Sequence, residues 1–271
     1  MVALGYFASL FIGISLGMIG GGGSILTMPV LVYLFGIPPV LATSYSLFIV
    51  GGTSCVGAAR NIINRNANVK TAIFFGAVSI NTVFLVRQYV VHTIPEKLIT
   101  INGNIITYSL LTLIVFGGLM VFASTKMIRS KVIAESDNVD SVSIPKLIIT
   151  GLLVGLITGF LGIGGGFLII PALVLVLNLP MKHAVGTSLI IITLNACAGF
   201  LGDIGKVKMD WQLLVPVTSI AIIGMFIGGY LNTKLSSGML KKIFGWFILC
   251  VGIYILIKEG LHLSYSTSKT K

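Results

Sequence analysis

The sequence predicts an all-α integral membrane protein that is built from two homologous repeats of four segments each. Three observations lead to this fold class: a hydrophobic composition, long uncharged stretches and an internal duplication. The chain has 271 residues, of which 56% are hydrophobic and only 9% are charged. A soluble domain carries about 25% charged residues, because its surface must be hydrated. The composition therefore excludes an ordinary soluble protein and indicates that lipid surrounds the chain.

Uncharged stretches that are long enough to cross a bilayer recur along the chain. A spanning helix needs about 20 apolar residues to cross roughly 30 Å of hydrocarbon. No Asp, Glu, Lys or Arg occurs within residues 2–59, 98–125, 147–181, 183–202 or 213–232. The N-terminal stretch lacks the basic start of a signal peptide, so we expect it to belong to the mature fold. The protein is therefore expected to cross the membrane several times.

The formal net charge of +11 arises from 18 basic and 7 acidic residues. The basic residues are scattered over short loops, which is typical of topology determinants and of contacts to anionic headgroups, and no nucleic-acid partner is expected. The three cysteines, Cys55, Cys197 and Cys250, lie in apolar segments, and their spacing fits neither a disulfide framework nor a metal cluster. We expect them to be small buried residues, with no metal and no cofactor in the protein.

An internal duplication organises the chain into two halves. Residues 13–57 align with residues 155–199 at a constant offset of 142, without a gap and with 16 identities in 45 positions. The matches include glycines and the prolines of both copies, which agree by chance much less often than leucine or valine in apolar sequence. The expected boundaries are a first transmembrane repeat at 1–125, a hydrophilic linker at 126–146, a second transmembrane repeat at 147–260 and a flexible tail at 261–271.

Each half is expected to contain one broken segment followed by three helices. The expected segments are 2–35, 40–59, 71–91 and 104–125 in the first half, and 147–179, 184–202, 212–232 and 240–258 in the second. A broken segment of about 30–35 residues is too long for one straight span and short for two. A re-entrant hairpin solves this, and it gives inverted repeats because three further crossings follow. A kinked full crossing is the alternative, and it gives parallel repeats with the C-terminus in the cytoplasm instead of outside.

Glycine runs interrupt both broken segments, in the motifs Gly17–Pro29 and Gly159–Pro171. Irregular backbone at membrane depth is tolerated only where it is buried in protein or lines a wet cavity. A half-helix that restarts there presents free N–H groups and about half a positive charge, which suits an oxyanion. Close packing of helices around small residues is the alternative. The candidate anion-binding residues in the motifs are Gly20, Gly21, Gly22, Gly23, Ser24, Gly162, Gly164, Gly165 and Gly166.

The helices that follow the motifs carry polar side chains at matched positions. Their hydroxyl and amide groups could complete the hydrogen bonds of an oxyanion, or they could bond to the backbone of their own helix. The candidates from these helices are Ser44, Ser46, Thr187, Ser188 and Asn195. Arg87, near the end of an expected helix, is interpreted as a side chain that reaches the interface, with an anion vestibule as the alternative.

The paired Gly-Gly-Gly…Pro motifs, the Ala-Val-Gly-Thr-Ser-Leu stretch at 184–189 and the duplicated eight-segment layout resemble the TauE/SafE sulfite exporter family. The resemblance covers essentially the whole chain. It implies transport of sulfite, organosulfonates or related sulfur anions across the bacterial cytoplasmic (inner) membrane. The first half departs from the pattern by reading Ala-Thr-Ser-Tyr-Ser-Leu at 42–47, so the two half-sites can contribute unequally.

The function expected from these features is secondary transport of a small sulfur-containing anion by alternating access, not enzymatic catalysis. A passive anion channel with the same lining is the first alternative, and a membrane redox protein that uses Cys55 and Cys197 is the second. A purely structural membrane protein is disfavoured, because it has no need of glycine runs at membrane depth. The expected partners are a small inorganic or organic anion and the lipid bilayer, and a homo-oligomer is compatible with the sequence.

Overall fold

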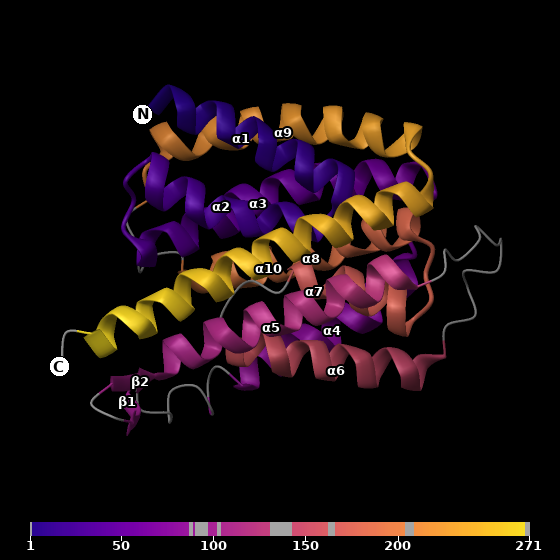
Figure 1. The fold of residues 1–271 in the computed structure, drawn as a ribbon. Coiled ribbons are helices and arrows are strands. Elements are labelled where there is room, and N and C mark those ends of the chain that lie inside the picture. The colour runs from indigo at the N-terminus through magenta and orange to yellow at the C-terminus, as the bar shows by residue number, and fades with distance from the viewer. Residues whose placement is uncertain are drawn as a thin grey trace.

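The computed structural model consists mainly of long helices that lie roughly side by side (Figure 1). It describes residues 2–86, 89, 97–101, 104–130, 143–161, 166–203 and 209–268.

The first half begins with a broken helix, and three longer helices follow it. The broken helix comprises α1 (Val2–Ile19), a 3-10 turn (Gly21–Gly23), α2 (Ser24–Pro29) and a π-helical turn (Val30–Leu34). The later elements are α3 (Pro39–Ile63), α4 (Val69–Leu85), strand β1 (Lys97–Ile101), strand β2 (Asn104–Thr107) and α5 (Tyr108–Arg129).

The second half repeats this order without the strands among its described residues. Its elements are α6 (Ile144–Leu161), α7 (Gly166–Pro171), a π-helical turn (Ala172–Val176), α8 (Met181–Asp203), α9 (Trp211–Lys234) and α10 (Ser237–Ser268). In both halves the π-helical turn follows the matched proline, Pro29 or Pro171, directly. Helix α10 runs through Ser268, so the segment expected to be a flexible tail from residue 261 is helical up to that residue.

The expectation of a helix from residue 104 is wrong for its first turn, because residues 104–107 form β2 and pair antiparallel with β1. Ile99 faces Ile106, and Ile101 faces Asn104. The segment is rich in Ile and Thr, which favour strands, and the sequence Asn102-Gly103 between them is typical of a short hairpin loop. Helix α5 therefore begins at Tyr108.

The main helix contacts join one half of the chain to the other. Helix α1 packs along α9, and α6, its counterpart in the duplication, packs along α4. Helices α3 and α8, which are counterparts, pack on each other, and so do α5 and α10. If each helix is replaced by its counterpart in the other half, the same contacts between helices are obtained.

Two hydrogen bonds between the halves are related to each other by the duplication in the same way. Asn68 caps the start of α4, and its backbone N–H donates to Thr187 Oγ1 at 3.0 Å. Asp210 caps the start of α9, and its backbone N–H donates to the hydroxyl of Tyr45 at 2.8 Å. Asn68 and Asp210 are 142 positions apart, as are Tyr45 and Thr187. The register of the duplication therefore extends beyond residues 13–57 to α4 and α9.

Helices of equivalent position run in opposite directions. In Figure 1, the start of α1 and the end of α10 lie at the left end of the bundle, and the turn between α9 and α10 lies at the right end. Arg60, near the end of α3, bonds to the carbonyl of Phe226 in α9, so α3 also ends on the right. Helices α1, α3, α5 and α9 run left to right, and α4, α6, α8 and α10 run back.

The first broken helix folds back on itself. The ring of Tyr6 in α1 lies 5.5 Å from the ring of Phe35, which follows the π-helical turn, in an edge-on arrangement. Gly5 also contacts the Phe35 ring, and a Cβ atom at Gly5 would lie 2.6 Å from it. The two ends of the segment 2–35 are therefore adjacent.

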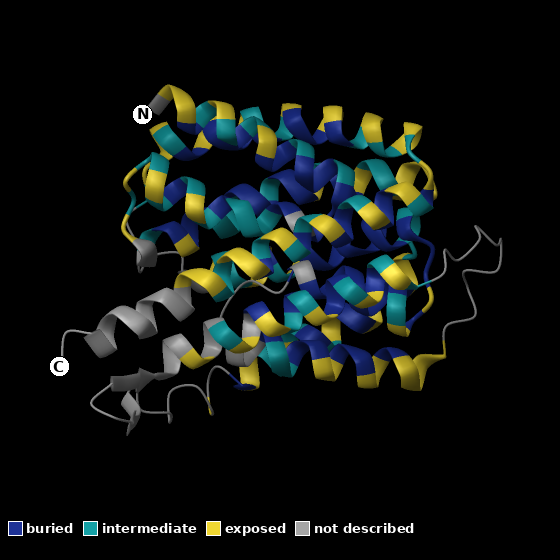
Figure 2. Ribbon diagram, viewed as in Figure 1, coloured by how far each residue is buried: buried dark blue, intermediate teal, exposed yellow. Residues whose placement is uncertain are grey.

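Apolar side chains occupy both the interior and the outer surface of the bundle. Figure 2 shows buried positions in the middle and exposed positions on the outward faces of the outer helices, and the exposed set includes Phe7, Phe84, Leu201 and Tyr254. Among the described residues, four helices are long and apolar enough to cross a membrane, within α3, α8, α9 and α10. An apolar exterior of this kind is matched to lipid, so the fold is that of a multi-pass membrane protein.

The expectation that the cysteines are buried is wrong. Cys55, Cys197 and Cys250 are all exposed on the bundle surface, on α3, α8 and α10. Each lies within one of the helices that are long and apolar enough to cross a membrane. A small apolar side chain is tolerated in lipid as well as in a protein core.

Candidate functional site

The first break occurs at the predicted glycines. Helix α1 ends at Ile19, and Gly20 has a φ of +75°, a conformation that side-chain-bearing residues rarely adopt. The N–H of Gly20 still bonds to the carbonyl of Leu16, at 2.7 Å, and closes the last turn of α1. The chain then reverses through the 3-10 turn, which contains Gly22, and restarts as a helix at Ser24. The left-handed conformation of Gly20 is the local cause of the break.

The predicted second break falls between α6, which ends at Leu161, and α7, which begins at Gly166. Three predicted site residues, Gly162, Gly164 and Gly165, fall outside the described residues.

The two breaks meet in the interior of the bundle. The backbones of Gly21 and Gly166 are in contact, and a Cβ atom at Gly21 would overlap the carbonyl of Gly166. A Cβ atom at Gly166 would lie 2.9 Å from Ser24 Oγ, and one at Gly20 would lie 2.6 Å from Ser188 Oγ. Five of the predicted site residues are thus brought together from both halves, although they are up to 168 positions apart in the sequence.

The hydroxyl groups around this contact bond to the protein itself. Ser24 Oγ donates to the carbonyl of Gly21 at 2.7 Å, and Ser188 Oγ donates to the carbonyl of Val185 at 2.8 Å. Thr187 Oγ1 accepts the N–H of Asn68. Among the described residues, this contact therefore shows close packing of the backbone and hydrogen bonds from hydroxyl groups to the protein's own carbonyls. These were the two alternatives to ligand binding. A ligand at this point has to displace these contacts.

The remaining predicted residues lie near the contact but outside it. Ser44 is buried and Ser46 is half-buried, both near the start of α3, where Ser46 is the counterpart of Ser188. Asn195 lies two turns beyond Ser188 along α8, and its buried amide oxygen has no hydrogen-bond partner among the described residues. A buried acceptor without a donor is uncommon in proteins, and a ligand or water can satisfy it.

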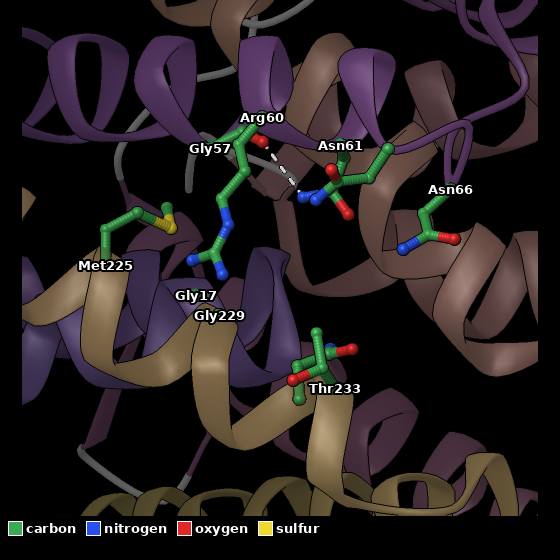
Figure 3. A pocket seen from close by; sticks show the side chains of 10 residues that line it. Gly17, Gly57, Arg60, Asn61, Asn66, Met225, Gly229 and Thr233 are labelled. Atoms are coloured by element: carbon green, nitrogen blue, oxygen red, sulfur yellow. Dashed lines mark hydrogen bonds between the residues drawn. The ribbon is translucent and has the colours of Figure 1, made fainter.

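Sequence reasoning missed a polar pocket at the right-hand end of the bundle, between α1, α3 and α9 (Figure 3). Its cavity volume is about 20 Å³, room for about one water molecule, and it is partly open to solvent. Its one charged side chain is Arg60, one of the basic residues that the sequence analysis interpreted as topology determinants and contacts to anionic headgroups. The signal that could have indicated the pocket is the cluster of asparagines at 61, 64, 66 and 68 directly after this arginine. The lining residues are Gly17, Gly57, Arg60, Asn61, Asn64, Asn66, Met225, Gly229, Asn232 and Thr233.

An apolar bundle whose internal contact is formed by two interrupted helical segments is the architecture of a membrane transporter. The comparison with known proteins agrees. The chain belongs to the sulfite exporter TauE/SafE family, whose sequence model matches residues 6–255.

Relatives of similar length carry transporter names. A probable membrane transporter protein of Xylella fastidiosa (strain 9a5c) is 30% identical over 258 residues, which cover 93% of this chain and 94% of the relative. The probable membrane transporter protein YdhB of Bacillus subtilis is 28% identical and covers 86% of this chain and 89% of its own length. These names state a class of protein and no substrate.

Proposed function

We propose that this protein is a secondary transporter that moves a small sulfur-containing oxyanion, such as sulfite or a sulfonate, across the bacterial cytoplasmic membrane by alternating access. The observation that carries the proposal is the meeting of the two breaks, where Gly20 and Gly21 of one half contact Ser188 and Gly166 of the other. The family name, sulfite exporter, supports an oxyanion of sulfur as the substrate class.

The proposed topology is an inverted repeat in which each half begins with a re-entrant hairpin. The opposite directions of the four equivalent helix pairs support the inversion (Figure 1). The contact between Tyr6 and Phe35 supports a first hairpin that enters and leaves at one end of the bundle. Inverted repeats of this kind permit two related conformations, one open to each side of the membrane. In the transport step, each half then takes up the conformation that the other half had before, and the site opens to the opposite side of the membrane.

The chemistry of the contact suits an anion. The helix restarts at Ser24 in one half and at Gly166 in the other, and the first N–H groups of a helix lack intrahelical acceptors. Glycine lets an oxyanion approach these groups closely. The hydroxyls of Ser24 and Ser188 supply further donors once they release their backbone carbonyls. The packed contact described above then represents a substrate-free, closed arrangement of the site.

Transport by the purified protein in proteoliposomes tests this proposal. We expect uptake of radiolabelled sulfite that is accelerated by unlabelled sulfite inside the vesicles and is competed by sulfonates. Uptake that requires neither countertransport nor an ion gradient identifies a channel in place of a transporter. Absence of a response to every anion in a panel of sulfite, thiosulfate, sulfate, sulfoacetate and small carboxylates contradicts the proposed function.

The redox alternative has its own test. Both cysteines of the matched pair, Cys55 and Cys197, face outward from the bundle and away from the contact of the two breaks. Replacing both with alanine should leave the initial rate of sulfite uptake within about twofold of the wild type, because no thiol takes part in binding. Loss of uptake in the double variant, at equal amounts of protein in the vesicles, favours the redox alternative.

A further inference from the structure

Arg60 projects from α3 across to α9 and is held there in a fixed position. Its Nη1 donates to the carbonyl of Phe226 at 3.1 Å, and its guanidinium lies 6.0 Å from the centre of the Phe226 ring. A Cβ atom at Gly229 would lie 2.5 Å from Nη1, so the guanidinium occupies the space that this glycine leaves open. Figure 3 shows the side chain pointing from α3 toward Gly17 and Gly229.

The arginine has hydrogen-bonding capacity left over. A guanidinium has five N–H donors, and the described contacts use Nη1 for the Phe226 carbonyl. Arg60 has no ion pair with any residue that the structure describes, and Asp210 lies at the far end of α9, where it caps the helix. A half-buried cation without a carboxylate is stabilised by an anion from solution, and the planar fork of arginine matches an oxyanion.

Asparagines surround the guanidinium and are themselves held in place. Asn61 donates to the carbonyl of Gly57 at 2.9 Å, and Asn232 donates to the carbonyl of Met18 at 2.8 Å. Asn66 also lines the pocket, and its backbone N–H bonds to the carbonyl of Asn61. Amide groups of this kind can donate hydrogen bonds without adding a competing negative charge. The pocket therefore combines one positive charge with neutral donors.

The pocket adjoins the contact of the two breaks. Asn232 bonds to the carbonyl of Met18, two residues before Gly20. On the other side, the carbonyl of Asn66 contacts Gly186, which lies two residues before Ser188. The end of α1 thus contributes Gly17 to the pocket and leads directly to Gly20 at the contact of the breaks, and Asn66 connects the pocket to the start of α8. A movement of the end of α1 therefore changes the shape of the pocket and the contact between the glycine breaks together.

We propose that this pocket is a second anion-binding site, in which Arg60 anchors a small oxyanion on its way to or from the glycine breaks. The inference rests on the proposed transport of an anion and adds the place where the anion first binds on one side. The guanidinium supplies the charge and the fork, and Asn64 and Asn66 lie at positions from which their amides can complete the hydrogen bonds. Met225 and Arg60 fill the space beside Gly57 and Gly229 in this arrangement, so the pocket widens when the anion binds.

The duplication gives this arrangement a counterpart in the sequence. At the offset of 142, Arg60 is matched by Gly202, and Gly229 is matched by Arg87. By sequence, each of the two matched pairs contains one arginine and one glycine, and in both pairs the arginine belongs to the first half and the glycine to the second. Arg60 lies in α3, and Arg87 lies outside the described residues.

The test compares Arg60→Gln with Arg65→Gln in the purified full-length protein. Arg65 lies five positions further on, in the turn that follows α3, is exposed and does not line the pocket, so Arg65→Gln removes one positive charge from the same end of the bundle. Binding of sulfite is measured by anion-dependent thermal stabilisation in detergent, and transport is measured in proteoliposomes. We expect Arg60→Gln to weaken binding about tenfold to a hundredfold, the loss expected for a charge-assisted hydrogen bond, and Arg65→Gln to change it less than about twofold. The affinity of Arg60→Lys for sulfite should lie between those of the two glutamine variants, because lysine retains the positive charge but lacks the paired N–H donors of the guanidinium.

A second variant does not depend on the packing of Arg60. Asn66→Asp places a carboxylate on the wall of the same pocket, where it repels the anion. We expect it to weaken binding while it leaves the melting temperature without sulfite nearly unchanged. Wild-type binding in Arg60→Gln, equal losses in Arg60→Gln and Arg65→Gln, or wild-type binding in Asn66→Asp each overturn the assignment of this pocket. Wild-type protein that neither binds nor transports any anion overturns the proposed function itself.

Discussion

Gly21 is a residue at which the two halves are in backbone contact, and a side chain there cannot be accommodated without separating them. We predict that Gly21→Ala abolishes transport and lowers the free energy of unfolding by about 3 kcal/mol, because its methyl group overlaps the carbonyl of Gly166. Thermal unfolding in detergent and sulfite uptake measure the two effects. Gly118→Ala is the matched control, because a Cβ atom there has open space on α5. Equal stability of the two variants contradicts the prediction.

Gly20 combines backbone strain with a steric conflict, and the two can be separated. Gly36 also has a positive φ, of +69°, but nothing lies within 4 Å of a Cβ atom placed there. We predict that Gly36→Ala loses only the strain energy of about 1–2 kcal/mol. Gly20→Ala should lose more, because its methyl group meets Ser188 Oγ. The excess should shrink in the double variant Gly20→Ala/Ser188→Ala, and an additive result in this cycle argues against direct contact.

At the scale of elements, two hydrogen bonds hold the halves in register: one joins the start of α4 to α8, and the other joins the start of α9 to α3. Tyr45→Phe leaves the N–H of Asp210 without this acceptor, and Thr187→Val does the same for Asn68. We predict a loss of about 1 kcal/mol in unfolding free energy for each variant, since each removes one partly buried hydrogen bond. Tyr254→Phe, on an exposed side chain of α10, is the control and should be neutral. Thermal melting of the variants in one detergent gives the comparison.

The elements also explain which segment boundaries were predictable. Glycine and proline set the breaks, so α1 ends directly before Gly20 and a π-helical turn follows each matched proline. The strand hairpin before α5 was missed, because the Ile-rich residues 104–107 fit a membrane helix and a strand equally well by composition. Burial of the cysteines was also mispredicted, because lipid and protein interiors accept the same apolar side chains.

For the whole molecule, the direction of the chain decides on which side of the membrane each end lies. The start of α1 and the end of α10 are at one end of the bundle, and the turn between α3 and α4 is at the other (Figure 1). Arg60, Arg65 and Lys70 lie in this turn or next to it, at the facing ends of α3 and α4. Loops rich in basic residues stay in the cytoplasm, so this end of the bundle is expected on the cytoplasmic side. We predict that alkaline phosphatase fused after residue 271 is active and that a cytoplasmic reporter fused there is not. The reverse result supports parallel repeats.

The sequence by itself determined the membrane environment, the duplication, the positions of the glycine breaks and the family, because each of these depends on composition or on local backbone preference. Gly20 alone requires the left-handed backbone that ends α1, whatever surrounds it. Only the tertiary structure decided that Gly21 meets Gly166 and that Arg60 is seated over Gly229, since these contacts join residues far apart in the chain. A small residue in a sequence shows where a close approach is allowed, and only the packed helices show which group makes that approach.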